Sequence, residues 1–118
     1  SLIQALNAQL DAILAEGLKQ RWARHIAMAE MVRAWARKYW ALFPDEAYLS
    51  NTVTTVENTR EVSVADLNAA LAERGAMISN GYGAKLREKT FRIAHMGDLT
   101  PDDIRWLLDQ INDILRLA

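Results

Sequence analysis

Apolar residues recur every three or four positions in four segments of the chain, and this spacing is typical of amphipathic helices. The segments are residues 2–16, 18–40, 64–74 and 101–115. Ser63 and Thr100 precede the last two segments as N-cap residues, and Gly75 follows the third, where a left-handed residue is favoured. The pattern therefore predicts a chain dominated by helix, with a long helix pair at its N-terminal end.

Three shorter segments between the helices favour extended structure. Residues 51–59 are rich in Thr and Val, residues 77–78 form a short apolar pair, and residues 89–94 alternate in polarity. Two glycines predict a turn over residues 80–83. The order helix, helix, strand, helix, strand, strand, helix predicts an α+β fold, a small and mostly antiparallel sheet covered on one face by helices. At 118 residues the chain is long enough for one domain and too short for two.

One arginine stands among apolar residues in the last predicted strand. Phe91 and Ile93 point to one face of that strand, and Arg92 and Ala94 point to the other. A guanidinium in such a place needs a carboxylate or phosphate partner, because a buried charge without one is costly. Two interpretations stay open from the residues alone: an Asp or Glu of the same fold, which is the commoner case, or an acidic substrate.

Composition excludes several classes of function. The net charge of −1 and the absence of a long basic run argue against binding to nucleic acid or to an anionic membrane, and no apolar run is long enough to span a membrane. The chain has no cysteine, which excludes disulfides and thiolate metal sites and is typical of a reducing cytoplasm. His25 and His95 are 70 positions apart and lack a paired ligand, so we expect no metal site.

The long second helix is unusually rich in tryptophan. Trp22, Trp35 and Trp40, with two methionines, make it apolar around most of its circumference. Such a helix is usually buried on more than one side, which predicts a second partner surface. The partner would be a further domain or another subunit, and a plain oligomerisation surface is an alternative function for this helix.

Four motifs, in order along the chain, resemble one enzyme family. They are W-A-R-H at Trp22–His25, N-T-V-T-T-V at Asn51–Val56, I-S-N-G-Y-G at Ile78–Gly83 and F-R-I-A-H-M-G-D at Phe91–Asp98. Together they resemble the C-terminal domain of class V pyridoxal-phosphate aminotransferases of fold type I, of the serine/alanine–glyoxylate or pyruvate type. The resemblance covers almost the whole chain. It implies that residues 1–118 are a single small domain, with the helix of residues 1–17 leading to a large domain that precedes Ser1.

The resemblance also assigns roles to individual residues. Arg92 would bind the carboxylate of a small amino or keto acid. A planar guanidinium can donate two parallel hydrogen bonds to the two oxygens of a carboxylate. Asn80, Gly81, Tyr82 and Gly83 would form a loop at the mouth of the active site, although a plain turn is the simpler interpretation. A phosphate cradle in this loop is disfavoured, because no helical pattern begins directly after it. His95 would support the site without touching the substrate.

The resemblance further implies that the catalytic lysine is absent from this chain. In the family the lysine that holds pyridoxal phosphate belongs to the large domain, and Lys19, Lys38, Lys85 and Lys89 are not in that motif. The parent enzyme would be a cytoplasmic homodimer that moves an amino group from serine or alanine to glyoxylate or pyruvate. The isolated chain is expected to hold no catalytic residue and no cofactor. The alternative is a stand-alone ligand-binding or protein-interaction module derived from this domain.

Overall fold

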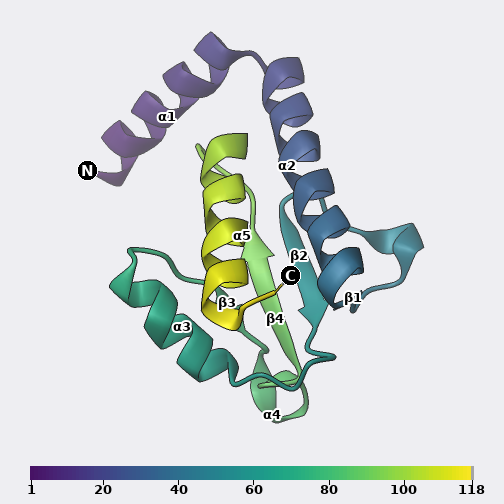
Figure 1. Ribbon diagram of the computed structural model, residues 1–118. Helices are drawn as coiled ribbons and strands as arrows, with labels where there is room; N and C mark the ends of the chain where they lie inside the picture. The colour runs from purple at the N-terminus through teal and green to yellow at the C-terminus, as the bar shows by residue number, and fades with distance from the viewer. Residues whose placement is uncertain (118) are drawn as a thin grey trace.

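The computed structural model describes residues 1–117, which form five α-helices, one short 3-10 helix and four strands (Figure 1). The α-helices are α1 Leu2–Glu16, α2 Leu18–Tyr39, α3 Val64–Glu73, α4 Gly83–Leu86 and α5 Pro101–Leu115. The 3-10 helix is Glu46–Tyr48, and the strands are β1 Ala41–Leu42, β2 Val53–Glu57, β3 Ser79–Asn80 and β4 Thr90–Ala94. The predicted α+β class is confirmed.

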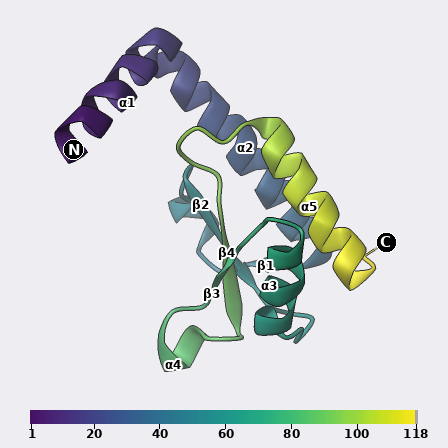
Figure 2. The same cartoon turned by 90° about the vertical axis from the view of Figure 1, so that its left-hand side faces the viewer.

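All strand pairs of the sheet are antiparallel, and the strand order is β1-β2-β4-β3. Figure 2 shows α2, α3 and α5 on one side of the sheet, with α1 extending away from the body of the domain. No helix of residues 1–117 lies against the other face of β2 and β4. The sheet therefore has one face covered by helices and one open face, as the sequence pattern predicts.

The hydrophobic core fills the space between the covered face and the helices. Phe91 and Val56 stand opposite each other on β4 and β2, and both are fully buried. The ring of Phe91 meets Trp40 edge to face, with the centroids 5.1 Å apart, and contacts Trp35 at 6.4 Å. Aromatic pairs of this geometry add to the gain from burial. The α5 helix completes the core with Ile104, Leu108 and Ile111.

The α1 helix contributes nothing to that core. None of its residues is buried, and Leu2 is 90% exposed. It continues through Gly17 into α2, where Trp22 is 60% exposed while Trp35 lies in the core. The Trp-rich helix is therefore buried at its C-terminal half and open at its N-terminal half.

Three details of the predicted elements are wrong. The strand predicted at residues 77–78 is found at Ser79–Asn80, where it pairs with β4. The two-residue β1 was not predicted, because its pairing with β2 rather than its own pattern makes it a strand. The loop over residues 80–83 leads directly into α4, a single turn closed by a hydrogen bond from the Arg87 amide to the Gly83 carbonyl. A short helix therefore follows this loop, although the sequence pattern predicts none there.

Candidate functional site

Arg92 lies in the middle of β4, on the open face of the sheet. The register places it opposite Thr55 of β2 on one side and Ser79 of β3 on the other. Residues directly opposite each other on paired strands point to the same face. The guanidinium is therefore flanked by two hydroxyl residues that the sequence analysis did not single out. Only the register could identify them, because they are 37 and 13 positions away along the chain.

The protein itself satisfies the Arg92 guanidinium poorly. Nη2 donates one long hydrogen bond of 3.4 Å to the backbone carbonyl of Asn80. The buried Nε has no acceptor among residues 1–117, and no carboxylate of those residues pairs with this arginine. The internal Asp or Glu partner that residue chemistry favours is therefore not found in the described chain. A partly buried cation in this state is suited to accept an anion from elsewhere.

Other arginines of the chain provide a contrast. Arg33, on α2, is only 6% exposed, and its Nε, like that of Arg92, has no acceptor among residues 1–117, but its Nη atoms donate to the Glu30 carboxylate, to the Ser50 carbonyl and to the Asn51 side chain. Five further arginines each pair with at least one carboxylate, namely Arg21, Arg24, Arg37, Arg74 and Arg105. Carboxylates are thus commonly recruited in this fold, but none is recruited at Arg92.

The loop of residues 80–83 lies beside Arg92 at the edge of the sheet. Asn80 is held inside the domain, since its Oδ1 accepts hydrogen bonds from the amides of Gly81 and Glu88. Gly81 is required by close approach, because a Cβ there would lie 1.9 Å from the Leu86 carbonyl oxygen. Tyr82 is 83% exposed and points away from the core. The loop therefore consists of a fixed base, Asn80 and Gly81, and an exposed tip.

His95 follows β4, but its side chain lies on the covered face of the sheet. The ring is fully buried, with Nδ1 3.1 Å from the Asn51 carbonyl oxygen and Nε2 2.8 Å from the Thr54 hydroxyl. A carbonyl oxygen only accepts, so Nδ1 carries the proton and Nε2 accepts from Thr54. Burial lowers the pKa of His95, and the positive charge of Arg33 acts in the same direction. These contacts are structural, and they face away from Arg92.

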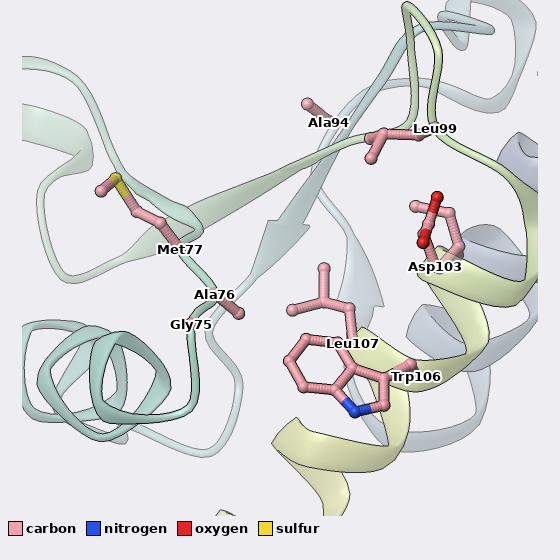
Figure 3. A pocket seen from close by; sticks show the side chains of 9 residues that line it. Gly75, Ala76, Met77, Ala94, Leu99, Asp103, Trp106 and Leu107 are labelled. Atoms are coloured by element: carbon pink, nitrogen blue, oxygen red, sulfur yellow. The ribbon is translucent and has the colours of Figure 1, made fainter.

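A separate cavity of about 370 Å³ opens between the α3–β3 connection and α5. Figure 3 shows Ala76 and Met77 on one side, Trp106 and Leu107 on the other, and Ala94 and Leu99 at one end. Asp103 is the charged residue in its wall, and Thr100 already binds that carboxylate at the start of α5. Arg92 does not line this cavity. The cavity and the Arg92 site are therefore distinct features, although Ala94 is only two residues from Arg92.

The lysines are the residues of this chain that could form a Schiff base with pyridoxal phosphate. The four lysines, Lys19, Lys38, Lys85 and Lys89, are all exposed, and none reaches a buried site beside Arg92. A Schiff base needs a lysine amine placed at the substrate. Among the described residues, Arg92 is partly buried without a carboxylate partner, and every lysine is exposed.

No group of three His, Cys, Asp or Glu side chains in residues 1–117 is arranged to hold a metal ion. Among these residues no helix is sufficiently long and apolar to cross a membrane.

Comparison with known proteins identifies relatives of the chain, although no protein-family model matches it. It is 37% identical over 106 residues to an L-aspartate–glyoxylate aminotransferase of Paracoccus denitrificans. It is 31% identical over 119 residues to a serine–glyoxylate aminotransferase of Arabidopsis thaliana. These matches span 84% and 98% of this chain, but only 26% and 29% of the two relatives.

Comparison with solved structures identifies the same group of enzymes. An alanine–glyoxylate aminotransferase from Nostoc sp. superimposes with a TM-score of 0.82 and 25% identity, over 91% of this chain and 29% of that enzyme. The chain thus matches between a quarter and a third of much larger proteins. By sequence and by architecture, it belongs to the serine/alanine–glyoxylate and pyruvate type of aminotransferase and has the α+β fold of that family's small domain.

Proposed function

We propose that this chain is the C-terminal small domain of a pyridoxal-phosphate-dependent aminotransferase, and that Arg92 binds the carboxylate of the amino or keto acid substrate. One observation carries the proposal: Arg92 is a partly buried guanidinium on the open face of the sheet, without a carboxylate partner among residues 1–117. The relatives, which are named as glyoxylate aminotransferases, support the substrate class.

The geometry indicates how Arg92 would act. A guanidinium offers a planar set of donors that matches the two oxygens of a carboxylate, so the bound acid is oriented as well as attracted. The sheet holds Arg92 rigidly between two neighbouring strands, because β2 and β3 pair with β4 on either side. Pyridoxal phosphate, when bound by the rest of the enzyme, supplies the electron sink for amino-group transfer. The role of this chain is to hold the substrate in one orientation beside it.

The large domain of the parent enzyme is the proposed partner. Exposed apolar side chains recur along α1 and the first half of α2, and we call this set the N-terminal apolar surface. Its residues are Leu2, Ile3, Leu6, Leu10, Leu14, Leu18, Trp22 and Ile26. Exposed apolar side chains in this number are typical of a contact with another domain or subunit. The parent enzyme would be a cytoplasmic homodimer, with residues 1–118 as one domain and α1 leading to the large domain.

The proposal implies that the chain alone does not transaminate. The experiment is to add pyridoxal phosphate to the chain, reduce the mixture with borohydride and map any adduct by mass spectrometry. We expect no single lysine to be labelled in preference to the others, because all four are exposed. A stable adduct at one lysine would contradict this part of the proposal.

The role of Arg92 is tested in the full-length enzyme by comparing Arg92→Lys with Arg105→Lys. Arg105 lies on α5, is exposed and pairs only with Asp102 three residues away. Loss of a hydrogen bond to a charged group costs about 1.5–3 kcal/mol, so KM for the amino and keto acid should rise about 10- to 100-fold in Arg92→Lys only. Equal KM values in the two variants would refute the carboxylate site and favour a stand-alone interaction module.

A further inference from the structure

Glu88, between α4 and β4, has a backbone conformation that L residues rarely adopt. Its φ is +63°, in the left-handed region that favours glycine. Glu61 is a second glutamate in that region, with φ +54°, and it is exposed. Glu88 differs because its side chain is partly buried and engaged. An unfavourable conformation that is retained at an engaged residue points to a role for the contacts that it makes possible.

The Glu88 carboxylate connects two parts of the domain. Oε2 accepts from the Val64 amide at 2.6 Å, and Oε1 accepts from the Ala65 amide at 3.2 Å, at the start of α3. Oε1 also accepts from Nδ2 of Asn80 at 3.1 Å. Burial raises the pKa of Glu88, but the hydrogen bonds from Val64, Asn80 and Ala65 outweigh it and leave the pKa below its ordinary value. The group is therefore an anion that accepts from all three donors.

Glu88 fixes Asn80 through its backbone as well. The Glu88 amide donates to Oδ1 of Asn80 at 2.8 Å, so both ends of the Asn80 side chain are bound by one residue. The backbone carbonyl of Asn80 accepts from Nη2 of Arg92. The contacts thus form a continuous series from α3 through Glu88 and Asn80 to the guanidinium of Arg92. A third contact, from Nδ2 of Asn58 to the Glu88 carbonyl oxygen at 2.8 Å, holds Glu88 to the segment that follows β2.

We propose that Glu88 is a positioning residue for the Arg92 site, which it sets through Asn80 and not by touching the substrate. The carbonyl of Asn80 occupies one Nη of the guanidinium and leaves the remaining donors for a carboxylate. Turning Asn80 would release that Nη and let the side chain reorient. This inference rests on the proposed function only for the identity of the ligand, because the series from Glu88 to Arg92 exists in the chain itself.

A purely structural role for Glu88, as a cap of α3, makes different predictions. Ser63 already caps that helix, since its hydroxyl accepts from the Asp66 amide at 3.1 Å. Asn80→Ala separates the two roles, because it removes the amide that Glu88 holds and leaves both Glu88 oxygens to accept from the α3 amides. Capping by Glu88 is therefore retained in this variant, while its contacts with Asn80 are lost. Glu88→Gln weakens the series at its other end, because an NH2 group replaces one accepting oxygen.

The first experiment uses the chain alone and does not depend on activity. The Nε–H signal of Arg92 in nitrogen–proton NMR is assigned by its loss in Arg92→Lys, and its exchange with water is then measured. The buried Nε should exchange slowly in the wild type and about tenfold faster in Glu88→Gln, the factor expected from loss of one hydrogen bond to a charged group. Glu61→Gln is the matched control, and it should leave the Arg92 signal unchanged. Asn80→Ala should speed this exchange as well, and an Arg92 signal that changes in neither Glu88→Gln nor Asn80→Ala overturns the proposal.

The second experiment measures KM and kcat in the full-length enzyme. Glu88→Gln should raise KM for the keto acid about tenfold, because a displaced guanidinium binds the carboxylate less well, and kcat should change much less. Glu88→Gly removes the carboxylate but relieves the left-handed strain, so it should raise KM without loss of stability. If both variants are less stable than the wild type but have an unchanged KM, Glu88 acts only as a cap of α3. That result would overturn the positioning role. If Arg92→Lys leaves KM unchanged, the proposed function fails, whereas the NMR result still decides the series from Glu88 to Arg92.

Discussion

The two faces of strand β4 differ in how completely their polar groups are satisfied. On the covered face, Phe91, Ile93 and His95 are fully buried, and both nitrogens of His95 have partners inside the domain. On the open face, Arg92 keeps a buried Nε without an acceptor among residues 1–117, and Ala94 is exposed. Alternate residues of one strand thus serve two purposes. The covered face stabilises the domain, and the open face carries an arginine without a carboxylate partner among residues 1–117.

Burial alone does not set Arg92 apart from the other residues of this strand. His95 is more buried than Arg92 and is also ionisable, yet every contact of its ring is internal. Six other arginines form ion pairs, and Arg60, Arg87 and Arg116, which form none within residues 1–117, are exposed. Arg92 is distinguished because it is partly buried and has no carboxylate partner among those residues.

The largest effect is expected from Phe91→Ala on the covered face. It removes a ring that packs against Trp40 and Trp35 and leaves a cavity, so the free energy of unfolding should fall by about 3–5 kcal/mol. Urea unfolding of the chain measures this. Ala94→Ser on the open face is the control and should change stability by less than about 0.5 kcal/mol. Similar losses in both variants would mean that the two faces are equally packed.

A sharper comparison uses the same substitution on adjacent residues of β2. Thr54→Val removes the hydroxyl that donates to Nε2 of His95 and leaves that buried acceptor unpaired, which should cost about 1–3 kcal/mol. Thr55→Val, opposite Arg92 on the open face, should cost less than about 0.5 kcal/mol. Thermal unfolding of the two variants under the same conditions tests the difference. A larger loss in Thr55→Val would reverse the assignment of the faces.

The smallest effect is a dependence of stability on pH through His95. Its pKa is lowered from the ordinary 6.5 in the folded state, so the unfolded chain takes up a proton more readily. The free energy of unfolding should therefore fall as pH drops below 6.5. Glu16 acts in a separate and more acidic range, because hydrogen bonds from Arg24 and Arg21 lower its pKa from 4.5 to about 2. The contribution of Glu16 is present above 4.5 and is lost as pH falls towards 2.

His25→Gln is the control for this pH effect, since it removes the other histidine and keeps His95. The slope just below pH 6.5 should persist in His25→Gln and disappear in His95→Gln. If the slope instead disappears in His25→Gln and persists in His95→Gln, the pH dependence arises from His25 on α2 and not from His95.

Much of the fold could be predicted from the sequence because its signals are local. The helices begin where Ser63 and Thr100 accept from amides of the first turn, and both caps are found in the structure. The alternation that puts Phe91 and Arg92 on opposite faces follows from the geometry of a strand, whatever the strand pairs with. The strand β1 and the one-turn helix α4 were missed, because two and four residues carry too little periodicity to be read.

The site divides in the same way. The sequence by itself determined that Arg92 points to the opposite face of β4 from Phe91 and Ile93. The motifs around Arg92 determined which family the chain resembles. Only the tertiary structure decided that Arg92 has no carboxylate partner among residues 1–117 and that Thr55 and Ser79 flank it. It also connected Glu88 to Arg92 through Asn80. Pairing of this kind depends on strand register and on loops that meet in space, and neither is encoded by the spacing of residues along one segment.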